Sequence, residues 1–544
     1  MQNKKQKKKR ALRGLEIPDL NYAILKDKRK SGFVRKFLVS KLVMTAFLLL
    51  IQIFVWILFI VRLQSYMNFF LGGNIVLSAF FMIHLSNCAG KNEFKITWLL
   101  PAVVFPLFGV SAYILYHTNI GGAKTAKRLA FLKAQTDKHL PSRAQNEEVI
   151  RAFPQVKDIQ HYLINQGHFC PHKNNKVRYF ANGETLYPEL LASLKVAKEF
   201  IFMEFFIIDI DETWFSILRV LEEKVQNGVE VRILYDAFGS IMLSTRTYEN
   251  YLKAHGIKSK IFLPLRPIFS TQQNNRDHRK IIVIDGKTAF TGGINLKNEY
   301  FNVGKNKFAY WKDNFIKIEG SAVLNLTLMF LQTWNISCKG ERGLQDNFSK
   351  YAKRDFDVFP GEKGLVIPYG DDAFCKSNIA EDVYLYILSK TQRYIYIMSP
   401  YVVIDNQILE ALIFAARRGA DVKLIVPSQP DHIITFCIGK VFLKTLAENK
   451  IRVFLYDKGF IHAKTFVSDD KVATVGSINL DYRSLFHHFE CGTFLYNVQS
   501  IADIKNDFIG TLADCKEMCV GDYEKLPLRT RLTGRIFKLF APLL

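Results

Sequence analysis

The sequence predicts an α/β protein, a duplicated α/β sandwich of two pseudo-twofold lobes that is preceded by N-terminal transmembrane helices. Three observations predict this architecture. A strand–helix–strand pattern occurs twice in the same order, the pattern HxKxxxxD occurs twice, from His278 and from His462, and long apolar segments precede both copies. With 544 residues, the chain is long enough for more than one domain.

The two lobes are predicted from the order of their elements. Each half shows a strand rich in β-branched and aromatic residues, a helical pattern that ends at a glycine, and a second strand. These elements lie at 197–211, 214–228 and 229–236 in the first half and at 391–405, 408–419 and 420–427 in the second. Alternating strands and helices are typical of α/β layers, and duplication makes a pseudo-twofold pair natural.

The domain boundaries follow from this repeat. We expect a polar linker at 118–175, a first lobe at 176–345 and a second lobe at 346–544. The chain ends in RIFKLFAPLL, a basic and apolar sequence that suits either a membrane surface or a terminal helix packed on the core.

The N-terminal region is strongly basic. Residues 1–41, which we expect to form a basic cytoplasmic tail, hold fourteen Lys or Arg and three Asp or Glu, and the whole chain has a formal charge of +24. Such a charge attracts a polyanion, which could be nucleic acid, an anionic bilayer or a phosphate-bearing substrate. Because much of it lies beside apolar segments, anionic lipid explains the charge as well as nucleic acid does.

Membrane segments are expected within 42–117, at 42–61, 67–85 and 96–116. The first is long enough to cross a hydrocarbon core of about 30 Å. Basic residues flank the region on both sides and favour the cytoplasm, whereas three full crossings would separate them. We therefore expect one segment to be re-entrant or interfacial, either the one with Pro101 and Pro106 or the one with Gly72. The expected protein is multi-pass, in a cell membrane, with a cytoplasmic catalytic part.

The repeated motif predicts a phosphate site. In each copy the His and the Lys are two residues apart, so on a strand they share a face, His278 with Lys280 and His462 with Lys464. An ammonium group suits phosphate oxygens, and an imidazole can attack phosphorus or pass a proton. Two such half-sites that face each other would surround one phosphate, with one histidine as nucleophile and the other as acid and with no metal.

Further candidates follow each motif. Asn295 and Asn479 lie in glycine-bearing loops, where a close backbone approach would let their amides bind the substrate phosphate, and Ser477 precedes the second asparagine. A catalytic histidine usually needs a carboxylate to fix its tautomer, and Asp313 and Glu490 occupy equivalent places in the two halves.

The motif aspartates, Asp285 and Asp469, belong to the same catalytic motif and each closes a strand before a tight turn. A turn-forming role is at least as well supported as direct chemistry, and both interpretations stay open. A short sequence, GHFCPH, contains His168, Cys170 and His172; we interpret it as a loop, with a metal site as the alternative.

The paired HxKxxxxD motifs, followed by GGxN or GSxN, resemble the phospholipase D superfamily over residues 176–544. The membrane segments, Glu204 in IFMEFF and the C-terminal sequence make the chain similar to bacterial cardiolipin synthases. The resemblance implies a phospholipase D-type sandwich and a phosphohistidine route. In that route one phosphatidylglycerol gives its phosphatidyl group to a histidine, glycerol leaves, and a second phosphatidylglycerol attacks. We favour His278 as nucleophile and His462 as acid.

The resemblance implies no cofactor and no metal in the reaction. The expected partners are phosphatidylglycerol and anionic membrane lipid, and no nucleic acid is expected. Two enzyme alternatives remain: a phospholipase D or phosphatidyltransferase with another acceptor, such as water, serine or phosphatidylethanolamine, and a membrane-bound nuclease. A catalytically dead scaffold would have lost a His or Lys from one motif, and both motifs are intact.

Overall fold

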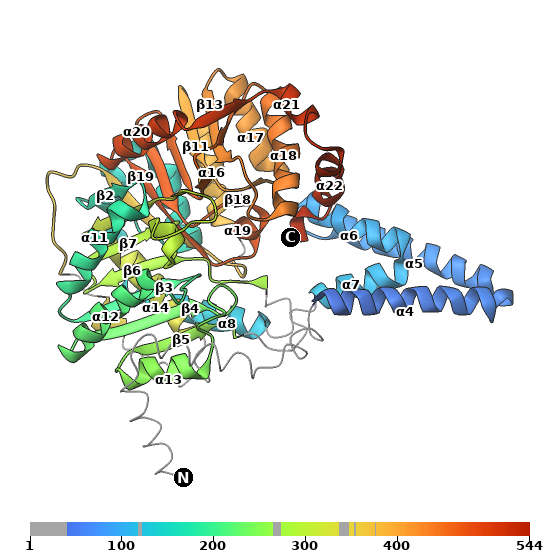
Figure 1. Ribbon diagram of the computed structural model, residues 1–544, viewed down its shortest axis with the longest axis horizontal. Coiled ribbons are helices and arrows are strands. Elements are labelled where there is room, and N and C mark those ends of the chain that lie inside the picture. Colours follow the sequence, from blue (N-terminus) through green and yellow to red (C-terminus); the bar gives the residue numbers. More distant parts are fainter. Residues whose placement is uncertain are drawn as a thin grey trace, which may run out of the picture.

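The computed structural model describes residues 41–117, 122–264, 274–336, 348–352, 355–375 and 377–543. It shows two α/β lobes, one above the other in Figure 1, and a rod of N-terminal helices that projects from them. The expected basic tail, apart from Lys41, and the expected lobe boundary at 345/346 lie outside the described residues.

The first lobe contains a seven-stranded sheet in the order β2-β9-β7-β6-β3-β4-β5. Its strands are β2 (Lys176–Phe180), β3 (Phe200–Phe205), β4 (Glu230–Asp236), β5 (Lys258–Phe262), β6 (Lys280–Ile284), β7 (Thr288–Gly292) and β9 (Phe315–Glu319). Strands β3, β4 and β5 are parallel, and the other pairs are antiparallel. All six residues of β3 are buried, as expected of a central strand that is covered on both faces.

The second lobe repeats this order. Its nine-stranded sheet runs β1-β10-β19-β17-β16-β11-β13-β14-β20, in which the seven strands from β10 to β14 correspond one by one to those of the first lobe. They are β1 (His172–Lys173), β10 (Leu365–Asp371), β11 (Tyr394–Met398), β13 (Asp421–Pro427), β14 (Arg452–Tyr456), β16 (Thr465–Ser468), β17 (Val472–Gly476), β19 (Glu490–Tyr496) and β20 (Cys515–Met518). The mixed α/β fold with a duplicated half agrees with the sequence prediction.

Helices cover both sheets and fill the space between them. In the first lobe these are α11 (Gly183–Lys195), α12 (Glu212–Gln226) and α13 (Arg246–Ala254); in the second they are α16 (Ile379–Lys390), α17 (Asn406–Arg417), α18 (Ile433–Glu448), α20 (Ser500–Leu512) and α21 (Val520–Glu524). Helix α14 (Val323–Ile336) is buried on nearly every side and contacts β3 and β6 of one sheet and β10 of the other. A helix that is apolar all round belongs in such a sandwiched place.

The stretch that we expected to be a linker, 118–175, is folded where the structure describes it. It forms α8 (Gly122–Thr136), α9 (Arg143–Ala152) and α10 (Lys157–Tyr162), and α8 packs against α14. The polar composition of this stretch hides a buried apolar face, which the sequence did not reveal. Leu129 and Leu132 belong to the main core.

The N-terminal rod is made of α4 (Lys41–Val61), α5 (Met67–Asn87), α6 (Asn92–Val104) and α7 (Pro106–His117). The expected segment at 96–116 is not one helix, since Phe105 separates α6 from α7 and these two pack as a hairpin. At Gly109 a Cβ atom would lie 2.4 Å from the backbone of Ala102, so only glycine permits this crossing. Gln52 in α4 accepts a hydrogen bond from the backbone N–H of Phe108 at 3.0 Å.

Among the side chains that the structure describes, one helix, Gln64–Asn87, is long and apolar enough to cross a membrane, and Leu50–Val61 forms a shorter apolar helix. Helices α6 and α7 have 13 and 12 residues. At 1.5 Å per residue each is about 20 Å long or less, which is too short for a bilayer core of about 30 Å. The segment at 96–116 is therefore not one complete span, and it holds Pro101 and Pro106, which mark one of the two segments expected to be re-entrant or interfacial.

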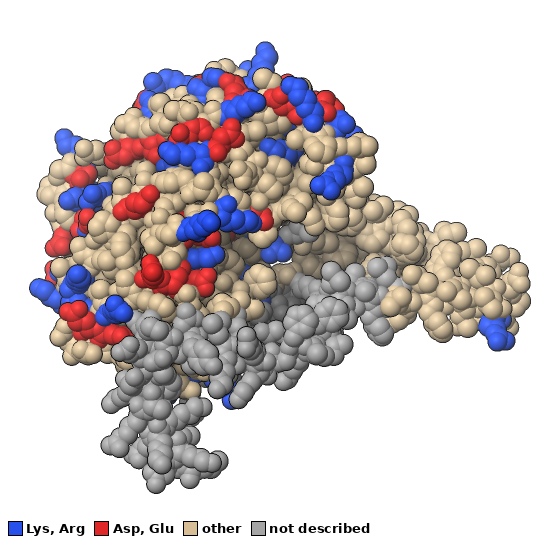
Figure 2. All heavy atoms as spheres, viewed as in Figure 1, with Lys and Arg blue, Asp and Glu red and all other residues tan. Residues whose placement is uncertain are grey.

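The surface of the rod is apolar and largely uncharged, in contrast to the two lobes (Figure 2). Between Leu42 and Gly90 the only charged side chain is Arg62, at the turn that joins α4 to α5. Large apolar side chains such as Phe69 and Ile75 are 79% and 71% exposed. A contiguous apolar surface of this kind marks a contact with membrane or protein.

The second lobe holds the base of the rod through a buried ion-pair cluster. Lys91 pairs with Glu381 and Asp405, and the backbone N–H of Asn406 donates to Glu93 at 3.0 Å. The C-terminus of the chain lies beside this junction in Figure 1.

Part of the C-terminal sequence lies in helix α22 (Leu528–Lys538), which packs on the core, as one of the two interpretations expects. It packs on α18, where a Cβ at Gly534 would lie 2.3 Å from the carbonyl oxygen of Cys437. Its other face exposes Leu528, Leu532 and Ile536, four residues apart, beside the base of the rod.

Candidate active site

Each motif histidine is held by the backbone of the opposite lobe. The N–H of His278, from the first lobe, donates to the carbonyl of Phe489 at 2.9 Å, and the N–H of His462, from the second, donates to the carbonyl of Lys312 at 2.6 Å. A short parallel pairing of β8 (Trp311–Lys312) with β15 (Phe460–Ile461) joins the lobes at the same place. The two half-sites therefore meet at the lobe junction, as the repeated motif predicts.

The carboxylates that orient these histidines are exchanged between the lobes. Glu490, from the second lobe, lies 2.9 Å from Nδ1 of His278 through Oε1 and 3.1 Å through Oε2. Asp313, from the first lobe, lies 2.6 Å from Nδ1 of His462 through Oδ2. Each carboxylate thus accepts the Nδ1–H of the histidine in the other half and leaves Nε2 free for chemistry. Asp313 and Glu490 thus each contact a motif histidine, in a crossed arrangement that the sequence did not predict.

Burial keeps both imidazoles neutral. Loss of solvent lowers the pKa of His278 to about 3, although Glu490 opposes the shift, and lowers the pKa of His462 to about 4, with Lys464 adding to it. Burial alone would raise the pKa of Glu490, yet His278 beside it holds that pKa below its usual value. At neutral pH the site therefore contains two neutral imidazoles, each with a lone pair on Nε2 available to attack or to accept a proton.

The two lysines are buried next to the histidines. Lys280 donates to the backbone carbonyl of His278 at 2.5 Å, and Lys464 donates to the carbonyl of His462. Burial lowers the pKa of Lys280 to about 8 and that of Lys464 to about 7, which places both lysines near the point where ammonium and amine are equally populated. An anionic phosphate bound beside them would favour the ammonium form.

One detail of the predicted geometry differs. The sequence placed His and Lys together on a strand, but β6 begins at Lys280 and β16 begins at Thr465, so both histidines lie in the extended segments before the strands. The hydrogen bonds of these segments go to the opposite lobe, which explains why the strands of each sheet start later.

The motif aspartates hold strand ends instead of substrate. The carboxylate of Asp285 accepts backbone N–H groups from Lys198, Glu199 and Phe200, at 2.8, 2.8 and 2.9 Å, just where β3 begins. The seven residues from His278 to Asp285 follow a nearly extended path, which separates them by on the order of 20 Å. Such a separation favours a structural role for Asp285 over direct chemistry.

Asp469 repeats the arrangement in the second lobe. Its carboxylate accepts N–H groups of Gln392, Arg393 and Tyr394, at 2.7, 2.9 and 2.9 Å, at the start of β11. Both aspartates have positive φ, 54° for Asp285 and 56° for Asp469, in the turn region that Asp tolerates better than most residues. These hydrogen bonds favour the structural role for both aspartates, which is one of the two interpretations that the sequence left open.

The three residues expected to bind the substrate phosphate, Asn295, Ser477 and Asn479, differ from one another in their hydrogen bonds. Asn295 accepts the N–H of Ile207 at 3.1 Å and donates to the hydroxyl of Tyr300 at 2.9 Å, so both ends of its amide are used to hold loops. Ser477 donates its hydroxyl to Glu490, which makes it a support for that carboxylate. Asn479 is buried, and its Oδ1 has no hydrogen-bond partner.

The Gly293–Ser477 difference between the motifs has a physical reason. A Cβ at Gly293 would lie 2.1 Å from Oδ1 of Asp313, so the shorter aspartate of the first half requires glycine there. In the second half the longer Glu490 leaves room for Ser477, which hydrogen-bonds it. The sequence analysis did not predict that the residue at this position depends on the length of the neighbouring carboxylate side chain. The difference between GG and GS in the two motifs was the available sign of it.

Glu204, one of the residues on which the resemblance to cardiolipin synthases was based, lies on β3 next to the strand that follows His278. It is fully buried on β3 opposite Ile281, and its Oε1 lies 4.0 Å from Nη1 of Arg279. Burial raises its pKa. The GHFCPH sequence is ordinary packing, since His172 contacts Ser321 and Asn325 at 3.1 and 3.2 Å.

Sequence reasoning missed His488. It is buried beside His278, with ring centroids 5.7 Å apart, and its Nδ1 lies 3.7 Å from Oε1 of Glu490. The first lobe has Trp311 in the equivalent place, with its ring 5.4 Å from that of His462. The equivalence follows from the register, because Gly476 pairs with Gly492 where Gly292 pairs with Phe315.

This fold and this junction of two HxK half-sites define a phosphatidyltransferase of the phospholipase D superfamily. Residues 190–325 and 384–511 match the family described as cardiolipin synthase, PLD-like domain. A cardiolipin synthase of Geobacillus sp. (strain WCH70) is 34% identical over 471 residues, which are 85% of this chain and 91% of that protein. The chain belongs to the cardiolipin synthase family.

Further relatives and one solved structure are similar over most of the chain. A cardiolipin synthase 1 of Staphylococcus aureus (strain COL) is 30% identical over 87% of this chain and 95% of that protein. An uncharacterized protein of Streptococcus mutans is 41% identical over 85% of this chain and 99% of that protein. Among solved structures, the phosphatidylserine synthase of Haemophilus influenzae has the same fold, with a TM-score of 0.55 and 15% identity over 72% of this chain and all of that one.

Proposed function

We propose that this protein makes cardiolipin by transferring the phosphatidyl group of one phosphatidylglycerol to a second, with release of glycerol. The observation that carries the proposal is the crossed pair of orienting carboxylates, Glu490 on His278 and Asp313 on His462. This arrangement provides one junction with two imidazoles whose Nε2 atoms are free, which is what a double displacement at phosphorus without a metal needs.

In the first step Nε2 of His278 attacks phosphorus. An N–P bond forms, the bond from phosphorus to the glycerol oxygen breaks, and His462 gives the departing oxygen its proton from Nε2. Because the neutral form of His462 predominates in the free site, this proton is gained when the anionic phosphate binds beside it. Lys280 and Lys464, as ammonium groups, neutralise the phosphate oxygens in the transition state.

In the second step the roles reverse. The neutral Nε2 of His462 takes the proton from a hydroxyl of the second phosphatidylglycerol, the resulting oxygen attacks phosphorus, and the N–P bond to His278 breaks. Glu490 and Asp313 keep each Nδ1–H in place throughout and stabilise an imidazolium when it forms. The reaction thus consumes no cofactor, and its net products are cardiolipin and glycerol.

The rod supplies the membrane attachment in this proposal. Helix α5 has 21 residues, about 31 Å of helix, and the α4–α5 hairpin would place both of its ends on one side of a bilayer and Arg62 on the other. The α6–α7 hairpin would then be the interfacial element, and the basic tail would face anionic lipid on the same side as the lobes. The protein would be a bacterial membrane protein whose substrates arrive along the bilayer surface.

The test is to incubate purified, detergent-solubilised protein with phosphatidylglycerol alone and a chelator, and to measure lipids and free glycerol. Cardiolipin with equimolar glycerol supports the proposal. Phosphatidic acid would show that water is the acceptor. If phosphatidylglycerol is not consumed, the proposal fails, and other acceptor lipids and then nucleic acid become the substrates to assay.

A further inference from the structure

His488 is a buried histidine without a role in the transfer reaction. It lies between α19 (Tyr482–Phe486) and β19, is 9% exposed, and neither of its ring nitrogens has a hydrogen-bond partner. Buried polar groups are nearly always hydrogen-bonded, whereas Nδ1 of this ring makes only a long ion-pair contact, 3.7 Å from Oε1 of Glu490, and this needs an explanation.

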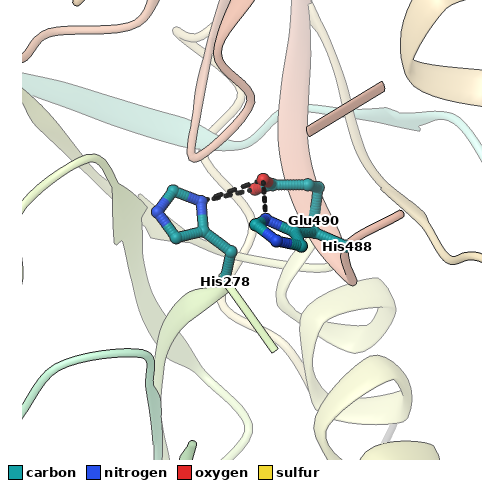
Figure 3. Close-up of side chains that lie close together, drawn as sticks. All are labelled: His278, His488 and Glu490. Atoms are coloured by element: carbon teal, nitrogen blue, oxygen red, sulfur yellow. Dashed lines mark hydrogen bonds and ion pairs between the residues drawn. The ribbon is translucent and has the colours of Figure 1, made fainter. Parts of the chain in front are cut away.

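Both histidine rings converge on one carboxylate. Figure 3 shows His278 and His488 meeting at the end of the Glu490 side chain, while the second nitrogen of His278 points away from it. One ligand atom from each of the three residues lies within 4.8 Å of the others. The carboxylate Oε1 is 2.9 Å from Nδ1 of His278 and 3.7 Å from Nδ1 of His488.

These separations suit a zinc ion. With zinc bonds of about 2.0–2.2 Å to nitrogen and oxygen, two ligand atoms of a tetrahedral site lie about 3.3 Å apart, between the two observed distances. Two imidazoles and a glutamate are also a known zinc ligand set that leaves one position open. Mg²⁺ and Ca²⁺, which prefer oxygen ligands, suit the same three residues poorly.

The second half-site lacks this arrangement. Trp311 stands where His488 stands in the other half, and an indole offers no lone pair to a metal. Among the described residues, His278, His488 and Glu490 are the only group of this kind. Within the part of the chain that the structure describes, we therefore expect one site, on the His278 side.

We propose that His278, His488 and Glu490 form a reversible inhibitory site for a zinc-class divalent cation. In the metal-free site Nδ1 of His278 carries the proton and Nε2 carries the lone pair. When Nδ1 donates its lone pair to Zn²⁺, the proton moves to Nε2, so that no proton is gained or lost by the ring. The nitrogen that would attack phosphorus then has no lone pair. The inhibitory effect rests on the proposed function of His278, whereas the binding does not.

The electrostatics allow a cation here, because the carboxylate of Glu490 supplies a negative charge to the metal. It lies 2.9 Å from Nδ1 of His278 and 3.7 Å from Nδ1 of His488.

The test measures binding and inhibition separately on the full-length, detergent-solubilised protein. Zn²⁺ binding is measured by competition with a chromophoric chelator, and the rate of phosphatidylglycerol consumption is measured with and without added Zn²⁺. The expected result is one Zn²⁺ per chain and inhibition that a chelator reverses. His488→Asn should weaken this binding by about 10–100-fold or more and make turnover insensitive to Zn²⁺, relative to the metal-free rate of the same variant.

His487→Asn is the matched control, since its ring lies one residue away and contacts the carbonyl of Pro542 at 3.1 Å. It should bind Zn²⁺ as the unaltered protein does. X-ray absorption at the zinc edge of the unaltered protein gives a measurement that needs no variant, and it should show two imidazole ligands and one carboxylate. Unchanged binding in His488→Asn, or a spectrum without two imidazoles, would overturn the inference.

The two proposals fail separately. If Zn²⁺ binds through His488 but no cardiolipin is formed, the site stands and the proposed function falls. If cardiolipin is formed and Zn²⁺ binding does not depend on His488, only the zinc site falls.

Discussion

Asp313 in the first lobe orients His462 in the second, at 2.6 Å, and Glu490 in the second lobe orients His278 in the first, at 2.9 Å. Neither lobe therefore contains a complete pair of histidine and carboxylate. Each half therefore depends on the other for the geometry of its histidine.

The first prediction concerns the exchanged carboxylates. Asp313→Asn should reduce kcat by up to about 10⁴-fold, because an amide cannot hold the Nδ1–H tautomer of His462. Glu490→Gln should do the same through His278. Steady-state kinetics together with thermal unfolding checks this, and a matched loss of folded protein would contradict a role in orientation.

The second prediction concerns the histidines. His278→Ala and His462→Ala should each abolish turnover and leave membrane insertion unchanged, because both side chains act at phosphorus and neither lies in the rod. His432→Ala is a control, since that side chain is 73% exposed and lies outside the junction. Substantial turnover in either motif variant would rule out the two-histidine mechanism.

The third prediction separates stability from activity. Asp285→Asn should lower the free energy of unfolding by about 1–3 kcal/mol, because a neutral amide has one acceptor oxygen where the carboxylate has two. It therefore accepts the three N–H groups at the start of β3 more weakly. Asp469→Asn should behave alike in the second lobe. Activity per folded molecule should be kept in both, as measured by turnover normalised to the folded fraction. Full stability with lost activity would show that these aspartates act in the chemistry.

The fourth prediction concerns Gly293. In Gly293→Ala the new Cβ would lie 2.1 Å from Oδ1 of Asp313, so Asp313 must move and His462 loses its partner. We expect a loss of kcat that approaches the loss in Asp313→Asn. Gly361→Ala, which meets no atom within 4 Å and, like Gly293, has no positive φ, controls for the general cost of replacing a glycine in a loop. Full activity in Gly293→Ala would mean that Asp313 is not needed where it lies.

The fifth prediction is a pH dependence. Phosphate binding needs the ammonium form, which is lost as pH rises through the pKa of about 7 for Lys464 and about 8 for Lys280. In the free enzyme kcat/KM should therefore fall as pH rises from about 7 to 8. The fall in kcat should occur at higher pH, because bound phosphate stabilises the ammonium groups. Coincident kcat and kcat/KM profiles would contradict this account.

Much of the fold and part of the site follow from the sequence for identifiable reasons. Strands β3 and β11 could be predicted from their β-branched and aromatic residues. The repeated motif could be recognised from its spacing. Which histidine each carboxylate meets could not be read from the sequence, because it depends on how two similar lobes pack. The helices at 122–162 were missed because a few buried leucines, such as Leu132, decide their packing within a polar stretch.

The roles of other site residues were hidden for a different reason. Asn295 and Asp285 have the residue types of a phosphate site, yet their hydrogen bonds go to the backbone of neighbouring segments that are distant in sequence. His488 has no counterpart in the first half, so the repeat gave no signal for it.

The most direct test of one shared centre is the stoichiometry of the covalent intermediate. The protein is mixed with phosphatidylglycerol, quenched at alkaline pH within the first turnovers, and analysed by intact-protein and peptide mass spectrometry. The account predicts at most one phosphatidyl group per chain, attached to His278 and absent from His278→Ala. Two groups per chain, one on each motif histidine, would show that the two lobes act as separate sites and would contradict the account.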